Sequence, residues 1–188
     1  MLATPSSQPA HRSCPPCTRL SMIVSAQAIA AQAHRGQKRA DGQDYLEHPI
    51  EVVRNLVEVG LCDPVLLGAA YLHDALEKGP ASIRVLIGAD LGDNVLHLVD
   101  VLTDDPMLSG DGRRGQQIDR AATMPLAARQ IKLADRLANL REPRPDWQPE
   151  QRLSYAVHSY ALLEALQGSH PELESQLRER LSLPVWRI

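Results

Sequence analysis

Two histidines and two aspartates are the residues of this chain best suited to hold a metal ion. His48 precedes an apolar segment, and His73 and Asp74 are adjacent near the end of another. Asp135 lies within the largely apolar run IKLADRLANL. Two imidazoles and two carboxylates suit a borderline-to-hard divalent ion such as Mn²⁺, with Fe²⁺, Co²⁺ and Zn²⁺ as competitors, whereas Mg²⁺ prefers oxygen ligands. The four residues therefore predict a divalent metal site.

Each of these residues also has an ordinary structural interpretation. His48 could cap a helix, and His73 could be a packed core residue. Asp135 could form a salt bridge with Lys132 or Arg136. A buried unpaired carboxylate is costly, so Asp135 in particular calls for a metal or a basic partner.

Helical spacing predicts two further polar groups beside the metal. Glu77 follows His73 by four residues, so the two share a helix face. From there Glu77 could handle protons for a metal-activated water. Asn139 follows Asp135 by four residues and suits a hydrogen bond to a ribose or phosphate oxygen. Together these groups predict attack of water on phosphorus.

Basic residues lie in two polar segments that could face such a substrate. Lys38 and Arg39 precede His48, and Arg113 and Arg114 lie in the segment DDPMLSGDGRRG. Arginine and lysine side chains hold phosphate groups through charge-assisted hydrogen bonds. A solvated surface position is the ordinary alternative for each of them.

The elements that must position these residues are predicted to be helices. Aromatic residues make up only 3% of the chain and Phe is absent, so the core must consist of Leu, Val, Ile and Ala, which favours helices over a sandwich or barrel. Apolar periodicity, Gly and Pro place the expected helices at residues 23–34, 50–59, 65–77, 81–87, 93–102, 116–122, 125–141, 149–166 and 171–181. Pro49 would begin the second of them with His48 at its N-cap, and residues 104–115 would be a loop. The predicted fold class is all-α, a compact multi-helix bundle.

Length and composition limit the class of protein further. The 188 residues suffice for one well-packed domain, expected over residues 21–188, after a Pro/Ser-rich leader over residues 1–20 that is expected to be disordered. The CPPC sequence in that leader has no second ligand pair for zinc and no strand-to-helix context for redox chemistry. A net charge of −3 argues against a general nucleic-acid binder. No run reaches the roughly 20 apolar residues of a membrane span, and no secretory signal is apparent, so a cytoplasmic location is expected.

The motifs together resemble one family. The runs AHRGQ-K-R-x-DG-x-x-Y-x-x-HP, LHDALE, LTDD and KLADRLANLR resemble the HD-domain hydrolases of the RelA/SpoT kind. Within that family the chain is most similar to the stand-alone small alarmone hydrolases, the group of the metazoan SpoT homologue. The similarity extends from about residue 21 to residue 181.

The resemblance implies an activity and a role for several residues. It implies removal of the 3′-pyrophosphate from guanosine tetra- or pentaphosphate, the alarmones of the stringent response, to give GDP or GTP plus pyrophosphate. The implied partner is thus a small nucleotide, and the oligomeric state stays open. The implied metal is commonly Mn²⁺, held by His48, His73, Asp74 and Asp135. Three further matches are the loop arginine at Arg39, the ribose-side asparagine at Asn139 and the pocket tyrosine at Tyr155, for which simple helix packing is the alternative.

The chain departs from the family pattern at positions that bear on the substrate. Lys78 replaces the second acidic residue of His-Asp-x-x-Glu-Asp. At this catalytic position it either changes proton handling and local charge or binds phosphate instead. Ala40 stands where a basic residue usually follows Arg39, Asp44 replaces a proline, and Pro106 replaces a lysine. The adenosine alarmone ppApp and NADPH therefore remain open as substrates. A degenerate domain that binds an alarmone with little turnover is the alternative from another class, and Lys78 is its direct support.

Overall fold

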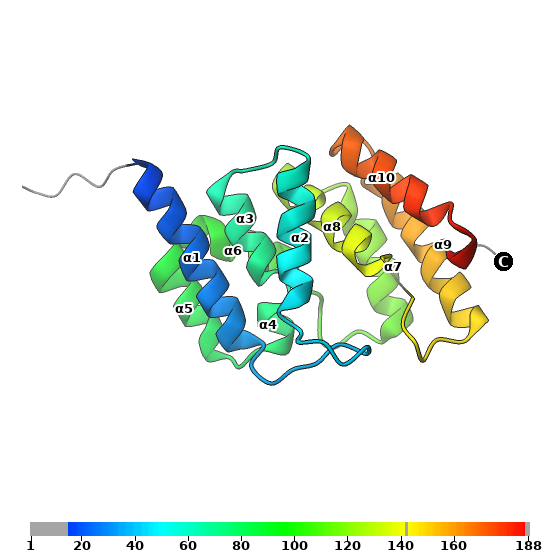
Figure 1. The fold of residues 1–188 in the computed structure, drawn as a ribbon, viewed down its shortest axis with the longest axis horizontal. Helices are drawn as coiled ribbons and strands as arrows, with labels where there is room; N and C mark the ends of the chain where they lie inside the picture. Colours follow the sequence, from blue (N-terminus) through cyan, green and yellow to red (C-terminus); the bar gives the residue numbers. More distant parts are fainter. Residues whose placement is uncertain (1–14, 142, 187–188) are drawn as a thin grey trace, which may run out of the picture.

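Ten α-helices and one 3₁₀ helix form the part of the chain that the structure, a computed structural model, describes: residues 15–141 and 143–186 (Figure 1). Apart from an isolated β-bridge between Lys38 and Asp44, these residues contain no β-structure, so the all-α prediction is confirmed. The helices are α1 (Pro15–Ala33), α2 (Glu47–Glu58), α3 (Pro64–Leu72), α4 (Ala75–Lys78), α5 (Ser82–Leu91), α6 (Asp93–Leu102), α7 (Gly110–Ala121), α8 (Leu126–Asn139), α9 (Pro149–Ala165), α10 (Pro171–Leu181) and the 3₁₀ helix η1 (Pro184–Trp186).

Helix α2 lies at the centre and joins two groups of helices (Figure 1). On one side it packs against α3, which contacts α1 and α6. On the other side α2 packs against α8, which contacts α10, while α9 packs against both α10 and α7. The loop between α1 and α2 runs along one end of the bundle, below α2 in Figure 1.

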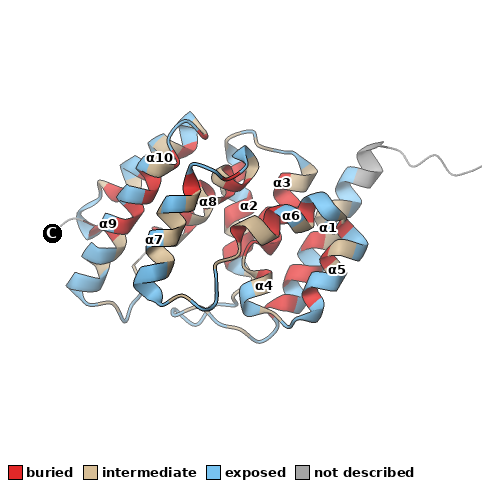
Figure 2. Cartoon of the chain, turned by 180° about the vertical axis from the view of Figure 1, so that it is seen from behind, coloured by how far each residue is buried: buried red, intermediate tan, exposed pale blue. Residues whose placement is uncertain are grey.

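The helices bury apolar stripes at the spacing that the sequence predicts. Leu173, Leu177 and Leu181 recur every four residues along α10 and are fully buried against α8 and α9. The buried faces of the helices point inward across the molecule, as Figure 2 shows in red. Asp63 is the N-cap of α3, where its carboxylate accepts hydrogen bonds of 3.0 Å from the backbone N–H groups of Val65 and Leu66. No described helix is long and apolar enough to cross a membrane.

Several boundaries differ from the prediction, and three of them concern α1, α5 and α7. α1 begins at Pro15, so residues 15–20 of the expected leader are helical, whereas residues 1–14 lie outside the described part of the chain. α5 continues through Gly88 to Leu91, because glycine lowers helix propensity without preventing a helix that packs well. α7 begins at Gly110, so the segment with Arg113 and Arg114 is helix rather than loop. Packing against α9 outweighs the low helix propensity of its three glycines.

Candidate metal centre and cavity

The helix that carries the adjacent histidine and aspartate is interrupted at this pair. α3 ends at Leu72 and α4 begins at Ala75, with Asp74 between them at φ −101° and ψ −5°. The sequence predicts one continuous helix over residues 65–77, on which neighbouring side chains diverge by about 100°. The interruption removes this restriction. His73 Nε2 and Asp74 Oδ2 consequently lie only 3.6 Å apart.

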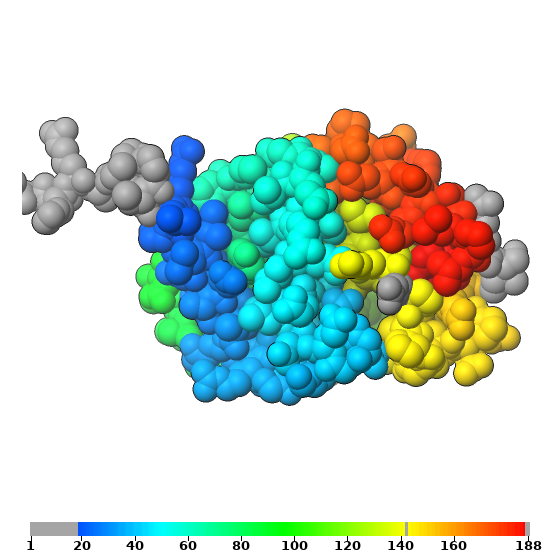
Figure 3. Space-filling view, in the orientation of Figure 1, coloured from blue at the N-terminus to red at the C-terminus, as the bar shows by residue number. Residues whose placement is uncertain are grey.

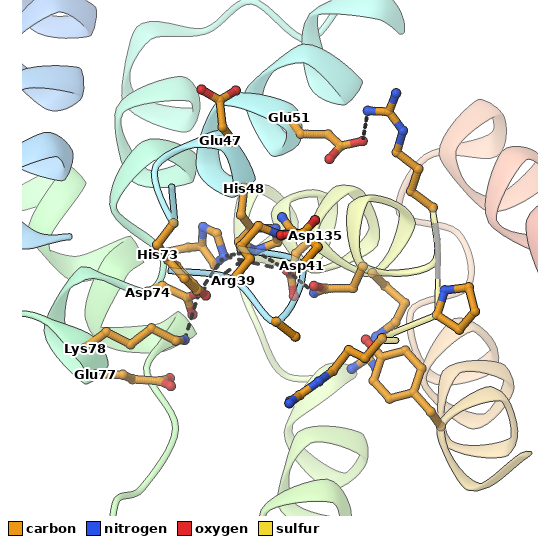
Figure 4. A pocket seen from close by; sticks show the side chains of 18 of the residues that line it. Arg39, Asp41, Glu47, His48, Glu51, His73, Asp74, Glu77, Lys78 and Asp135 are labelled. Carbon is orange, nitrogen blue, oxygen red and sulfur yellow. Dashed lines mark hydrogen bonds and ion pairs between the residues drawn. The ribbon is translucent and has the colours of Figure 1, made fainter. Parts of the chain in front are cut away.

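Four side chains from three parts of the fold converge on one point, as Figure 4 shows. His48 Nε2 of α2 lies 3.2 Å from His73 Nε2 and 3.1 Å from Asp135 Oδ1 of α8. His73 Nε2 lies 3.6 Å from Asp135 Oδ1, and His48 Nε2 lies 3.9 Å from Asp74 Oδ2. His48, His73 and Asp74 offer ligand atoms that all lie within 4.8 Å of one another. We call these four residues the metal cluster; they are the four that the sequence predicts.

His48 is not the helix cap that the sequence allows. α2 begins one residue before it, at Glu47, with Leu46 at the N-cap, so His48 occupies the first turn and is 3% exposed. Its Nδ1 is buried and has no hydrogen-bond partner in the described chain. The polar contacts of this ring are therefore those of Nε2, inside the cluster.

Neighbouring groups orient the other members of the cluster. His73 Nδ1 lies 2.8 Å from the carbonyl oxygen of Ala70. Because a carbonyl only accepts, Nδ1 carries a proton, and Nε2 is the nitrogen that would ligate a metal after losing its own proton. Asn139 Nδ2 donates to Asp135 Oδ1 over 2.7 Å. Asn139 therefore lies on the cluster face of α8, as its spacing predicts, and holds the aspartate in place.

The charges of the cluster depend on one another. Burial alone would lower the pKa of His73, but Asp74 and Asp135 outweigh it and raise this pKa to about 9. Burial would raise the pKa of Asp74, yet His73 and Lys78 hold it well below its usual range. The pKa of Asp135 is likewise held low by hydrogen bonds from His48 and His73, against the effect of burial. Both carboxylates are therefore ionised at neutral pH and attract a cation.

The donor set fits a divalent transition-metal ion. Two imidazole nitrogens, 3.2 Å apart, face two ionised carboxylates in a buried cluster. Nitrogen and oxygen donors in equal number are typical of Mn²⁺, Fe²⁺, Co²⁺ and Zn²⁺ sites. His48, His73, Asp74 and Asp135 are the residues that would hold such an ion.

Glu77 lies beside the cluster, on the short helix α4 that follows the interruption. Its Oε1 accepts a 2.6 Å hydrogen bond from the backbone N–H of Asp104, in the segment LTDD. Burial raises the pKa of Glu77 above its ordinary value, although this hydrogen bond opposes the shift. A carboxyl with a raised pKa on the cavity surface is suited to exchanging protons.

The cluster lies in the wall of a cavity of about 1010 Å³ between the two groups of helices. Figure 3 shows a hollow in this region, where the cyan and yellow segments meet. Ten Lys and Arg residues and seven Asp and Glu residues line the cavity, in a chain whose net charge is −3. The volume suits a nucleotide, and the local excess of cations suits its phosphates.

The loop between α1 and α2 brings Lys38 and Arg39 to this cavity. The β-bridge between Lys38 and Asp44 and the hydrogen bond from Arg39 N to Gln43 O (2.9 Å) give the loop a hairpin shape. The Lys38 ammonium is ion-paired with Asp44, so its charge is already partnered. The Arg39 guanidinium forms no ion pair with any described residue. Of the two predicted substrate ligands in this loop, Arg39 is thus the better placed to receive an anion.

The opposite side of the cavity, which we call the basic wall, consists of Arg113 and Arg114 on α7, Arg136 on α8 and Tyr155 on α9. Arg136 is 6% exposed, and its Cζ lies 4.8 Å from the centre of the Tyr155 ring. The Nε atoms of Arg136 and Arg113 are buried without a hydrogen-bond partner in the described chain. Tyr155 also contacts Trp147, with ring centroids 4.8 Å apart. No described carboxylate therefore neutralises the positive charge of Arg136 in the basic wall.

Two residues of the site have no predicted role. The sequence suggests Arg136 only as a salt-bridge partner for Asp135, whereas the structure stacks it on Tyr155 instead. Its signal is a basic residue within an otherwise buried helix, flanked by Asp135 and Asn139. The Tyr45 hydroxyl donates a hydrogen bond to Asp74. Its signal is its place three residues before His48, in the turn that leads into α2.

Comparison with known proteins places this fold and site in a family. A model of the HD domain matches residues 26–167. The chain is 34% identical over 166 residues to the guanosine-3′,5′-bis(diphosphate) 3′-pyrophosphohydrolase of Mus musculus, covering 85% of this chain and 92% of the relative. The corresponding Drosophila melanogaster protein is 38% identical over 160 residues, with 80% and 87% covered. The chain belongs to the HD-domain family of metal-dependent hydrolases.

Solved structures agree with this assignment. A protein described as a metazoan ortholog of SpoT that hydrolyses ppGpp superimposes with a TM-score of 0.81 at 32% identity, covering 94% of this chain and 97% of that chain. A Listeria monocytogenes protein with a TM-score of 0.60 at 23% identity shares the fold alone. Within the HD-domain family, this chain thus groups with the 3′-pyrophosphohydrolases of guanosine bis(diphosphate).

Proposed function

We propose that this chain removes the 3′-pyrophosphate of guanosine tetra- or pentaphosphate and produces GDP or GTP plus pyrophosphate. The observation that carries the proposal is the convergence of four ligand atoms, from His48, His73, Asp74 and Asp135, at one wall of a basic cavity of nucleotide size. The relatives that bear the name of this activity are covered over 87% or more of their length. The curated names and the charge of the cavity therefore support the same substrate class.

The metal cluster would hold one divalent ion, for which we propose Mn²⁺. When bound, the ion supplies Lewis-acid activation of a water and of a phosphoryl oxygen. The contact of His73 Nδ1 with the Ala70 carbonyl orients the ring, and Asn139 fixes Asp135. These contacts reduce the reorganisation that binding a metal requires.

Water attacks the phosphorus atom bonded to the ribose 3′-oxygen, and the bond between that phosphorus and the 3′-oxygen breaks. One proton leaves the attacking water, and the departing 3′-oxygen gains one. Glu77 is the residue we propose for this transfer, because it borders the cavity and burial raises the pKa of its carboxyl. Its hydrogen bond to the backbone of Asp104 keeps the carboxylate in place.

Arg39, Arg136 and Tyr155 are the proposed substrate ligands. Arg39 and the planar pair of Arg136 on Tyr155 offer flat cationic and aromatic surfaces to a base or a phosphate. Lys38 contributes to the field of the cavity, but its ion pair with Asp44 makes a direct contact secondary. A nucleotide with two diphosphate groups would extend from the metal cluster to the basic wall.

The proposed location of the protein is the cytoplasm.

The test is product analysis with purified protein and Mn²⁺, comparing ppGpp, ppApp and NADPH. We expect pyrophosphate and GDP from ppGpp with the wild-type protein and no product in EDTA. We expect no product from Asp74→Ala, whether Mn²⁺ is present or absent. If only ppApp releases pyrophosphate, or only NADPH releases phosphate, then that nucleotide is the substrate instead of ppGpp. Tight binding of ppGpp without turnover would contradict the enzyme proposal and favour the degenerate alarmone-binding domain.

A further inference from the structure

Lys78 directly contacts a member of the metal cluster. Its Nζ lies 2.8 Å from Asp74 Oδ2, the oxygen that also lies 3.6 Å from His73 Nε2 (Figure 4). The same ammonium lies 5.2 Å from the centre of the Tyr45 ring, and the hydroxyl of Tyr45 donates to Asp74 as well. A fixed positive charge therefore rests on one of the four groups that would hold a cation.

The main chain around Lys78 is held from two sides, so this contact is built into the fold. Gln37 Nε2 donates a 2.7 Å hydrogen bond to the Lys78 carbonyl oxygen. The next residue, Gly79, packs so tightly that a Cβ there would lie 2.6 Å from the Ala75 carbonyl oxygen and 3.1 Å from the Cβ of Ala33. Any residue at position 78 is thus placed at the edge of the cluster.

The Lys78 side chain also faces the cavity. It lines the cavity surface and is 35% exposed, and Asp74 is its single ion-pair partner in the described chain. An ammonium has three donor hydrogens, so it can contact Asp74 and still meet a second acceptor. The phosphate oxygens of a ligand in this cavity accept hydrogen bonds and carry the opposite charge.

These contacts have opposite consequences for the two ligands of the site. The Lys78 ammonium beside Asp74 opposes the binding of a divalent metal ion there, because it competes for the carboxylate and repels the ion. The same charge attracts the phosphates of the substrate. A neutral residue at position 78 would remove both effects at once.

We propose that Lys78 is a specificity-determining residue that exchanges partners: it pairs with Asp74 in the free protein and contacts a phosphate oxygen when the nucleotide binds. It weakens the binding of the divalent metal and strengthens that of the phosphorylated substrate. This inference rests on the proposed function for its substrate, whereas its metal half concerns the protein alone.

The experiment is a charge series at position 78 in the full chain. Lys78→Met removes the charge at similar length, and Lys78→Asp reverses it. Mn²⁺ affinity is measured by isothermal titration without nucleotide, and we expect it to rise about tenfold in Lys78→Met and further in Lys78→Asp. With saturating Mn²⁺, we expect the KM for ppGpp to rise about tenfold in Lys78→Met.

Lys38→Met is the matched control, because Lys38 lines the same cavity but pairs with Asp44, away from the cluster. We expect its Mn²⁺ affinity to change less than about twofold, as a contact outside the cluster requires. Melting temperatures verify folding, and Lys78→Gln replaces Lys78→Met if the latter is unstable.

Unchanged or weaker Mn²⁺ affinity in Lys78→Met would overturn the proposal, and so would an unchanged or lower KM. If the wild-type protein does not turn over ppGpp, the proposed function fails on its own. The dissociation constant of ppGpp for the Mn²⁺-loaded proteins then replaces the KM, with the same expected increase. A gain in turnover of Lys78→Asp with tighter ppGpp binding would show a degenerate site instead.

Discussion

The two sides of the cavity differ in how their charges are partnered. In the metal cluster every charged group contacts another: His48 and His73 contact Asp135, and Lys78 and Tyr45 contact Asp74. On the basic wall, Arg136 is as deeply buried as the histidines but is stacked on a ring, with its Nε unpartnered in the described chain. The cluster therefore presents two carboxylates to a cation, whereas Arg136 presents a positive charge to an anion. We therefore expect the metal and the reacting phosphate at the cluster, and the remainder of the nucleotide at the basic wall.

The largest effect should come from removing a carboxylate of the cluster. Asp135→Asn keeps the shape and the contact with Asn139 but loses the charge that both histidines face. Because even the outer partners of metal ligands contribute roughly 10- to 100-fold, we expect kcat/KM for ppGpp to fall by more than about 100-fold. Steady-state kinetics at saturating Mn²⁺ measure this. Activity within tenfold of wild type would exclude Asp135 from the metal set.

Glu77→Gln should separate proton transfer from metal binding. The amide oxygen can still accept from the Asp104 backbone, so the fold is retained. We expect kcat to fall about 100-fold, as for loss of a general acid or base, with Mn²⁺ affinity unchanged. Because burial raises the pKa of Glu77, a base function would be lost as the pH falls, starting at a higher pH than for an exposed glutamate. A wild-type pH–rate profile in Glu77→Gln would contradict this role.

Arg136→Met tests the basic wall, with a smaller expected effect. The guanidinium offers charge-assisted hydrogen bonds worth about 1.5–3 kcal/mol, so the KM for ppGpp should rise at least about tenfold while Mn²⁺ affinity stays constant. Arg84→Met is the control, since Arg84 pairs with Asp100 on the surface, outside the cavity. An unchanged KM in a folded Arg136→Met protein would show that Arg136 serves packing alone.

His158 is expected to affect stability rather than activity. Burial and the nearby Arg136 charge lower its pKa from 6.5 to about 4. The folded state thus disfavours the protonated ring, so stability is lost as the pH falls from about 6.5 toward 4. The loss attributable to His158 should reach up to about 3 kcal/mol. Urea unfolding of metal-free protein at pH 7 and 4.5 should show a smaller loss for His158→Gln, and an equal loss would contradict the assignment.

The sequence predicts the metal cluster better than the basic wall, for physical reasons. Metal ligands are restricted to a few residue types, so His48, His73, Asp74 and Asp135 stand out in apolar surroundings. Phosphate ligands are ordinary surface residues in a sequence, and Arg136 differs from them only through burial. Local patterns also missed that α7 is helical at Arg113 and that the chain turns at Asp74, because both depend on packing between distant segments. The helices with strong apolar periodicity, such as α6 and α10, were predicted within a residue.

The most direct test of the division between the two sides is to measure both ligands in both variants. Mn²⁺ stoichiometry by equilibrium dialysis and ppGpp binding to the Mn²⁺-loaded protein would be compared for Asp135→Asn and Arg136→Met. We expect Asp135→Asn to lose the bound Mn²⁺, and Arg136→Met to keep one Mn²⁺ per chain while binding ppGpp about tenfold more weakly. Full Mn²⁺ binding by Asp135→Asn, or loss of Mn²⁺ by Arg136→Met, would contradict the account.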